Sequence, residues 1–286
     1  MARATLTRRP VLGVLAGTLL ATAPGACTTW PAPAVPMPVR RIAARCAARE
    51  RCVLLPGVAS RADDFVREGF VGDLQRAAPA CELLLADAHL GYFVEGQLLQ
   101  RLREDVVRPP GVSGVSGASG VSGASEGAGE TRARPWLVGI SLGGMGALAY
   151  AMRHGSEIAG VLAIAPYLGR RELLRDISAA GGPLAWSRQP AAAGSASAPP
   201  AAIEGEMWRW LARRGSGDAA GPPIHLGYGR GDRFADALRV LQSLLPAGHT
   251  DVVDGGHDWP PWRALWQRWL QRGLLVGANA GCGSTA

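Results

Sequence analysis

One turn constrains the fold of this chain more than any other stretch of its sequence. Residues 137–140 predict a buried strand, residues 147–152 favour a helix, and the strand enters the helix through Gly139-x-Ser141-x-Gly143. In so sharp a turn, a β-carbon at either glycine would collide with the neighbouring strand or helix. The middle side chain is pushed outward, so we expect Ser141 to be exposed at the amino end of a helix. Free N–H groups there favour negative charge on a bound group.

Strands and helices alternate through most of the chain. Almost continuously apolar runs predict strands over residues 52–55, 82–87, 137–140, 160–166, 223–229 and 250–254. Amphipathic stretches predict helices over residues 60–77, 95–107, 234–245 and 259–275. Strands without polar alternation are typical of parallel sheets that are covered on both faces. We therefore predict an α/β fold with a mostly parallel central sheet, in a domain spanning residues 41–277.

Two stretches interrupt this alternation. Residues 111–130 repeat glycine, a small apolar residue and serine, a composition that predicts a disordered insertion. Residues 170–220 combine an arginine-rich amphipathic piece with a Gly/Ala/Ser/Pro stretch, and we expect them to form a cap over the sheet. Trp208 and Trp210 either line the substrate entrance or anchor this cap. Residues 278–286 are expected to be a frayed tail.

The amino-terminal stretch has the composition of an export signal. Arginines precede an apolar run over residues 11–21, and small residues then lead to Cys27, so we expect a signal over residues 1–27. Cys27 is either lipidated, which would attach the protein to a membrane, or part of an ordinary cleavage region. Residues 28–40 are rich in proline and predict an extended tether. The expected location is the periplasm, a membrane anchored through a lipid, or the exterior.

The charge of the chain is basic, with a formal net charge of +7 and arginine as the sole basic residue besides histidine. Loss of the three arginines in the leader would leave about +4. No block of arginines is interleaved with aromatic residues. We therefore expect no nucleic-acid partner.

Three polar residues of the types that nucleophilic catalysis needs follow predicted strands. A serine hydroxyl requires a base, and the base requires an acid that holds it. In an open α/β sheet such groups gather beyond the carboxyl ends of the strands. This position is shared by Ser141 as the candidate nucleophile, His257 as the candidate base and Asp232 as the candidate acid. The alternatives to Asp232 as the acid are Asp236 and Asp254.

Several of these motifs resemble the α/β-hydrolase superfamily, and within it the esterase D-like and enterochelin-esterase-like group. The resembling residues are Gly139 to Leu148, Ala165-Pro166-Tyr167, and Gly256-His257-Asp258-Trp259 with Trp262. The resemblance spans residues 50–272 and fits poorly through 111–130 and 181–220. It implies a serine esterase that cleaves small carboxylic esters through an acyl-enzyme, with no metal and no organic cofactor. The alternatives are an acyltransferase on the same fold and a non-catalytic binding lipoprotein.

The resemblance also implies an oxyanion hole. Its donors would be the backbone N–H groups of Val58, after the Pro56-Gly57 turn, and of Leu142, after the nucleophile. Many members of the group carry His-Gly where this chain has Pro56-Gly57. The candidate substrate contacts are Tyr92, Tyr167 and Trp259 on the same rim of the sheet; the alternative is that these rings belong to the core.

Three cysteines, Cys46, Cys52 and Cys81, lie inside the predicted domain. In the sheet that the resemblance implies, the strands that begin at Cys52 and after Cys81 are parallel neighbours. A Cys52–Cys81 disulfide is therefore within reach. A Cys46–Cys81 disulfide and three free thiols are the alternatives.

Overall fold

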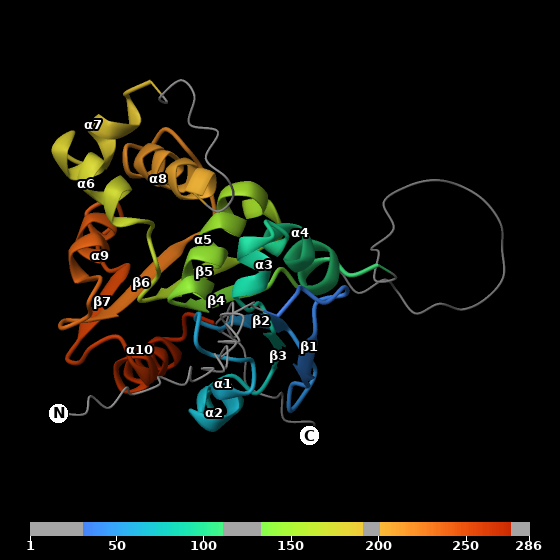
Figure 1. Ribbon diagram of the computed structural model, residues 1–286. Helices are drawn as coiled ribbons and strands as arrows, with labels where there is room; N and C mark the ends of the chain where they lie inside the picture. Colours follow the sequence, from blue (N-terminus) through green and yellow to red (C-terminus); the bar gives the residue numbers. More distant parts are fainter. Residues whose placement is uncertain (1–30, 111–132, 191–200, 276–286) are drawn as a thin grey trace, which may run out of the picture. The chain divides into compact units, whose positions relative to one another are not determined.

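The computed structural model describes residues 31–110, 133–190 and 201–275 (Figure 1). The expected export signal with Cys27, the expected insertion over residues 111–130 and the expected tail over residues 278–286 all lie outside the described residues. No helix in the described ranges is both long enough and apolar enough to cross a membrane.

A seven-stranded sheet runs through the domain in the order β1-β3-β2-β4-β5-β6-β7. All neighbouring strands are parallel except β1, which is antiparallel to β3. The mostly parallel α/β fold predicted from the sequence is therefore confirmed. The strands are β1 (Val39–Ile42), β2 (Glu50–Leu55), β3 (Cys81–Ala86), β4 (Trp136–Ile140), β5 (Gly160–Ile164), β6 (Ile224–Gly229) and β7 (Thr250–Val253).

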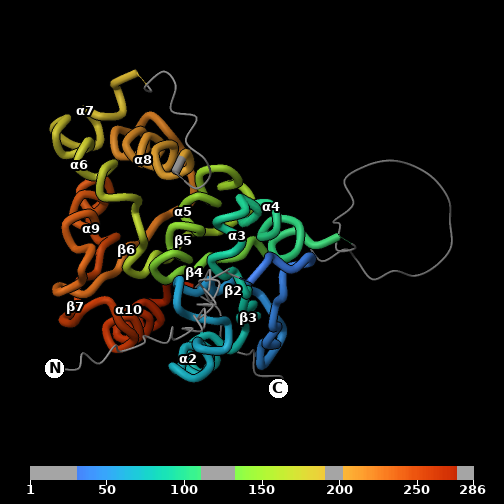
Figure 2. Tube along the Cα trace, in the orientation of Figure 1, coloured from blue at the N-terminus to red at the C-terminus, as the bar shows by residue number. Residues whose placement is uncertain are grey.

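Strand β1 lies at one edge of the sheet and β7 at the other (Figure 2). We expected a tether up to residue 40, but the described part of that stretch packs on the domain. The Tyr92 hydroxyl donates to the carbonyl of Ala34, and the Met37 N–H donates to Asp105. Residues Arg40 and Arg41 obscured this strand in the sequence, because charged residues on a short edge strand break the apolar run.

Helices cover both faces of the sheet (Figure 1). Helices α1 (Asp64–Arg67), α2 (Phe70–Ala77) and α10 (Trp259–Gln271) lie on one face, and α2 packs against α10. The other face carries α3 (Leu90–Val94), α4 (Leu98–Arg101), the π-helical turn η1 (Leu102–Val107), α5 (Leu142–His154), the 3-10 turn η2 (Gly155–Glu157) and α9 (Ala235–Gln242). The single helix expected over 60–77 divides at Gly69, whose φ of 82° ends one helical segment and begins the next.

The stretch between β5 and β6 contains α6 (Arg171–Ala179), α7 (Pro183–Ser187) and α8 (Ala201–Gly215). Helix α8 packs against α5 and returns the chain to β6. Trp208 is fully buried and donates its indole N–H to the carbonyl of Leu168, and Trp210 is also buried. Both rings therefore anchor this stretch to the body of the domain, which was one of the two alternatives given for them from the sequence.

The register of β2 against β3 explains why the expected disulfide is absent. Cys52 pairs with Leu83, and Cys81 pairs with Glu50, so the two cysteines are offset by two residues along the strands. Both are buried free thiols. The predicted Cys52–Cys81 bridge and its Cys46–Cys81 alternative were therefore wrong. Burial raises the pKa of the Cys81 thiol to about 12, which disfavours the reactive thiolate.

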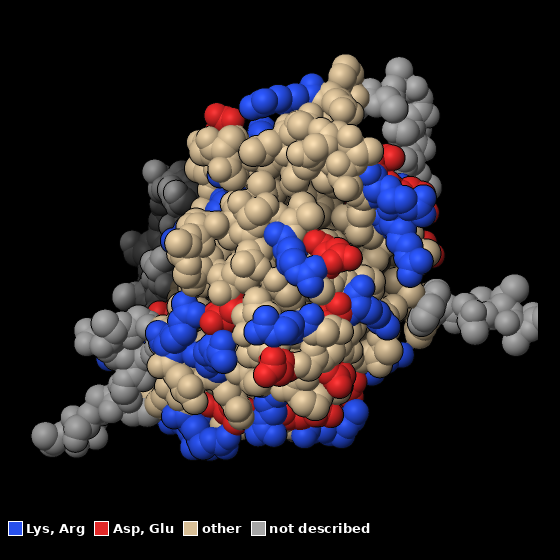
Figure 3. All heavy atoms as spheres, turned by 90° about the vertical axis from the view of Figure 1, so that its left-hand side faces the viewer, with Lys and Arg blue, Asp and Glu red and all other residues tan. Residues whose placement is uncertain are grey.

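Charged side chains of both signs lie beside one another on the face shown in Figure 3. Arg268 on α10 and Arg272 just after this helix share the carboxylate of Asp251 at the start of β7. Arg263 and Arg76 similarly share Asp73 on α2. Much of the positive charge of this region is therefore balanced by partly buried carboxylates.

Candidate active site

The turn between β4 and α5 holds Ser141 in a strained backbone conformation. Its φ is 51° and its ψ is −112°, values that a residue with a side chain rarely adopts. A β-carbon at Gly139 would lie 2.2 Å from the carbonyl oxygen of Gly143, and one at Gly143 would lie 2.2 Å from that of Leu55. Glycine is therefore required at both positions because a β-carbon would collide with the neighbouring backbone, as predicted from the sequence. Ser141 itself is only 7% exposed, so the expectation of an exposed side chain was wrong.

Two loops beyond the carboxyl ends of β6 and β7 bring Asp232 toward His257. The N–H of Gly231 donates to the carbonyl of Gly255, and a β-carbon at Gly229 would lie only 2.5 Å from that carbonyl oxygen. The backbones can approach this closely because glycine has no side chain. The close packing of these loops sets the separation between the acid and the imidazole.

Ser141, His257 and Asp232 form a continuous hydrogen-bonded series. His257 Nε2 lies 3.0 Å from Ser141 Oγ, and His257 Nδ1 lies 2.8 Å from Asp232 Oδ2. The Asp232 carboxyl is fully buried, and its other oxygen accepts the N–H of Phe234 at 2.8 Å. The rival acids lie outside this series, since Asp236 and Asp254 are almost fully exposed and pair with arginines.

Two aromatic rings flank the His257 imidazole. Phe234 and Trp262 lie with ring centroids 5.0 Å and 5.1 Å from it, and each ring is perpendicular to the imidazole. These contacts restrict rotation of the imidazole about its own bonds. Sequence analysis did not assign Phe234 to the site, although its position two residues after Asp232 was a usable signal.

The two expected oxyanion donors lie next to Ser141. A β-carbon at Gly57 would be 3.5 Å from Ser141 Cβ, so the turn after β2 touches the serine directly. The N–H of Val58, the next residue, donates to no acceptor within the described part of the chain. Leu142 is the first residue of α5, and its N–H stands outside the intrahelical hydrogen bonds. Both groups are therefore available to a ligand.

Tyr167 is also held beside the serine. Its backbone N–H donates to the Ser141 carbonyl at 2.9 Å, and its ring packs edge-on against Phe234 at 6.0 Å. Burial, together with the nearby carboxylate of Glu204 on α8, raises the pKa of the Tyr167 hydroxyl to about 12. Glu204 is itself 2% exposed and also binds Arg170. Glu204 was not predicted as a site residue, because it is a single acid that follows the Gly/Ala/Ser/Pro stretch and belongs to no recognisable motif.

The other two expected substrate contacts have different surroundings. Trp259 is half-buried and packs edge-on against Phe65, Phe70 and Trp262, with centroids 5.2 to 5.8 Å apart. Tyr92 is fully buried, away from the hydrogen-bonded series, and lines a cavity beside α5. The structure therefore brings Tyr167 to the serine, but it places Trp259 in an aromatic cluster and Tyr92 in a neighbouring cavity.

Comparison with solved structures identifies the architecture. An S-formylglutathione hydrolase from Staphylococcus aureus matches with a TM-score of 0.51 and 14% identity, over 79% of this chain and 82% of its own. A fluorophosphonate-binding serine hydrolase from the same organism matches with a TM-score of 0.52 and 13% identity, over 82% of this chain and 91% of its own. This chain has the α/β-hydrolase fold. No protein-family model and no curated protein matches the sequence.

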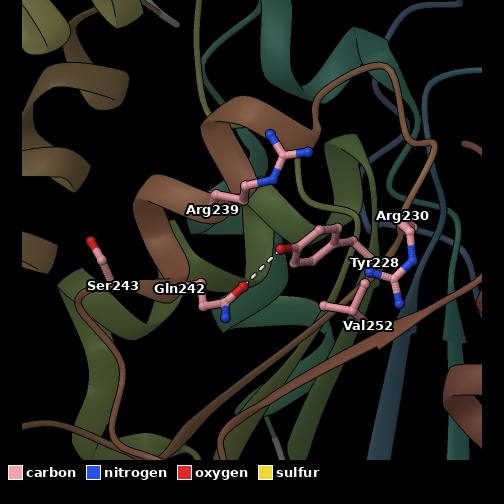
Figure 4. Close-up of a pocket in the computed structure, with 6 residues that line it drawn as sticks. All are labelled: Tyr228, Arg230, Arg239, Gln242, Ser243 and Val252. Atoms are coloured by element: carbon pink, nitrogen blue, oxygen red, sulfur yellow. Dashed lines mark hydrogen bonds between the residues drawn. The ribbon is translucent and has the colours of Figure 1, made fainter.

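In the α/β-hydrolase fold of this chain, Ser141, Asp232 and His257 follow β4, β6 and β7, at the edge where parallel strands present their carboxyl ends. A separate hollow of about 430 Å³ lies beside β6, β7 and α9 (Figure 4). There the Tyr228 hydroxyl donates to Gln242, and the two arginines of the hollow are each paired with a carboxylate. Its lining includes none of the three hydrogen-bonded residues.

Metal ligation has no evident place in the site. Within the described ranges, no group of three or more His, Cys, Asp or Glu side chains is arranged to hold a metal ion. His89 instead caps α3, since its Nδ1 accepts the N–H of Gly91 at 3.1 Å. Burial lowers the pKa of this imidazole.

Proposed function

We propose that this chain is an exported serine hydrolase that cleaves carboxylic esters, with Ser141 as nucleophile, His257 as base and Asp232 as the acid that orients it. The observation that carries this proposal is the double hydrogen bond of His257, 3.0 Å to Ser141 Oγ and 2.8 Å to Asp232 Oδ2. The α/β-hydrolase fold supports it, because the named neighbours include serine hydrolases.

The geometry supports a two-step mechanism. Asp232 accepts the Nδ1–H of His257, which leaves Nε2 free to take the proton of Ser141 as Oγ attacks the ester carbonyl. The N–H groups of Val58 and Leu142 hold the resulting oxyanion. The tetrahedral intermediate then expels the alcohol, which leaves with the proton from His257. Water, deprotonated by His257, cleaves the acyl-enzyme, releases the acid and restores Ser141.

Hydrolysis of a simple aryl ester tests this function. We expect the full-length chain to hydrolyse p-nitrophenyl butyrate and Ser141→Ala to lose roughly 10³-fold or more of the activity. Ser243→Ala serves as a matched control, because Ser243 is an exposed serine at the carboxyl end of α9, outside the hydrogen-bonded series. Normal turnover by Ser141→Ala would overturn the proposal. Formation of a new ester when an alcohol is added would favour acyl transfer over hydrolysis.

Export rests on the sequence of the leader alone. The arginines before residues 11–21 and the small residues before Cys27 support translocation followed by either lipidation or cleavage. Cell fractionation with labelled palmitate distinguishes these routes. We expect Cys27→Ser to abolish labelling if the cysteine is lipidated and to leave the size of the mature protein unchanged if it is not. Retention of the full leader on protein in the cytoplasm would contradict export.

A further inference from the structure

Among the described residues, the charged side chains that line the hollow beside β6, β7 and α9 are all positive (Figure 4). The lining consists of Tyr228, Arg230, Arg239, Gln242, Ser243 and Val252. Its volume of about 430 Å³ is enough for a small molecule, since small-molecule pockets enclose roughly 300 to 1,000 Å³. We call this site the arginine hollow. It is separate from Ser141 and from the residues bonded to that serine.

The two arginines of the hollow come from different elements and lie near one tyrosine. Arg230 follows the last residue of β6, Arg239 belongs to α9, and α9 packs against β6. Figure 4 shows the two arginines on either side of the Tyr228 side chain. Burial raises the pKa of Tyr228, and Arg239 and Arg230 act in the opposite direction, so both guanidinium groups lie close to this phenol. A ligand placed over the Tyr228 ring would therefore be within reach of both.

The neutral polar groups of the arginine hollow add a further donor. The Tyr228 hydroxyl donates to Gln242 Oε1 at 2.7 Å, and the amide N–H groups of Gln242 donate to no acceptor in the described part of the chain. The Ser243 hydroxyl already donates to the Val240 carbonyl. The open N–H groups therefore belong to two cations and an amide, and they suit a ligand group that accepts hydrogen bonds and is negatively charged.

The aspartates that pair with the two arginines do not close the hollow. Asp254 pairs with Arg230 and Asp236 with Arg239, and both carboxylates are almost fully exposed and lie outside the lining. Solvent screens such ion pairs, so they contribute little and can be exchanged for a ligand. Each guanidinium also uses a single nitrogen for its aspartate, which leaves its other N–H groups open.

We propose that the arginine hollow binds a small molecule that carries two anionic groups, phosphate or carboxylate, on a compact body. Guanidinium groups bind phosphate and carboxylate through two parallel hydrogen bonds, so one anionic group would meet Arg230 and the other Arg239. The body of the ligand would lie on Tyr228 and Val252, which are neighbours in the register of β6 and β7. This binding site goes beyond the proposed ester hydrolysis and does not depend on it.

Calorimetric titration of the full-length chain at low ionic strength tests this site with two matched pairs of probes. Pyrophosphate is compared with inorganic phosphate, and benzene-1,3-dicarboxylate with benzoate. We expect the second anionic group to lower Kd by roughly ten-fold in at least one pair, and that pair identifies the ligand chemistry. Arg230→Gln and Arg239→Gln should each raise the Kd of that two-group probe by roughly ten-fold. Arg175→Gln is the matched control, because Arg175 is an exposed arginine of α6 that pairs with exposed Glu172.

Removal of the competing carboxylates should have the opposite effect. Asp236→Asn and Asp254→Asn free the guanidinium groups and are expected to lower the Kd of the two-group probe by roughly two- to five-fold, whereas Glu172→Gln leaves it unchanged. A variant that merely misfolds would not tighten binding. The site is overturned if no probe binds at 10 mM, if the second anionic group has no effect in either pair, or if Arg175→Gln weakens binding as much as Arg230→Gln. Competitive inhibition of p-nitrophenyl butyrate hydrolysis by the probe would also overturn it, because the anion would then lie at Ser141.

Discussion

The backbone N–H of Tyr167 donates a hydrogen bond to the carbonyl oxygen of Ser141 at 2.9 Å. This bond ties the loop after β5 to the turn that holds the serine. Ala165 has a φ of 44°, so this loop, like the serine turn, contains a strained residue at the rim of the sheet. The Tyr167 hydroxyl lies close enough to the Glu204 carboxylate of α8 for that charge to raise its pKa. One tyrosine therefore joins the serine turn to the helix that leads back to β6.

Tyr167→Phe separates the two sides of this residue, because it removes the hydroxyl near the Glu204 carboxylate and keeps the backbone bond to Ser141. We expect the free energy of unfolding to fall by about 1 kcal/mol and ester turnover to fall less than roughly ten-fold. Urea unfolding and steady-state kinetics measure the two effects. A loss of turnover as large as that of Ser141→Ala would instead show that the phenol takes part in the reaction.

Asp232→Asn keeps the shape of the acid but removes its charge. The amide no longer favours the imidazole tautomer with the proton on Nδ1, so we expect kcat to fall by roughly 10³- to 10⁴-fold. Asp254→Asn is the control, since Asp254 is 96% exposed and pairs with Arg230 rather than with His257. If the two variants retain equal activity, Asp232 does not orient His257.

Gly143→Ala tests the steric reason for the serine turn. Its β-carbon would lie 2.2 Å from the backbone oxygen of Leu55, and backbone on both sides must move to make room. We expect a loss of roughly 2 kcal/mol or more in the free energy of unfolding, or no folded protein. Gly72→Ala on α2 is the matched control, because its β-carbon meets only the end of the Arg76 side chain at 3.4 Å. There the alanine should add roughly 0.5 to 1 kcal/mol to stability.

His225 makes the stability of the fold depend on pH. Burial, the His249 ring stacked 4.3 Å away and Arg272 lower the pKa of His225 to about 4, against the opposing effect of Asp251. The unfolded chain takes up this proton near pH 6.5 and the folded chain only near pH 4, so stability falls as the pH is lowered between these values. Between pH 7 and 4 we expect the free energy of unfolding to fall by roughly 1 to 3 kcal/mol more than in His225→Gln. Urea unfolding at each pH measures this, and equal losses in the two proteins would contradict the assignment.

Much of the fold could be predicted because its strands are apolar throughout and are bounded by turns. Strands β2 to β7 lie where the sequence indicates them, within a few residues. Strand β1 could not be recognised, because its two arginines hide the apolar pair Val39 and Ile42, and because it depends on pairing with β3 far along the chain. The disulfide prediction failed for a related reason, since strand register is set by packing across the sheet and spacing in the sequence does not determine it.

For the candidate site, the residues that follow strands were predictable from position, and the structure brings Ser141, Asp232 and His257 into hydrogen-bonding contact. The roles of the aromatic residues were harder to predict, because a ring beside the end of a strand can either pack in the core or contact a ligand. Trp259 packs among other rings, whereas Tyr167 lies beside the serine. The tertiary contacts that separate these cases come from residues far apart in the chain.

Locating a covalent adduct tests whether Ser141 is the nucleophile. The full-length protein is treated with a fluorophosphonate, digested, and its peptides are analysed by mass spectrometry; only an activated serine reacts readily with this probe. We expect one adduct per chain, on Ser141. Ser141→Ala should form no adduct, and labelling should be strongly slowed in a variant that lacks the His257 imidazole. An adduct on another serine, or unchanged labelling of Ser141→Ala, would contradict this assignment.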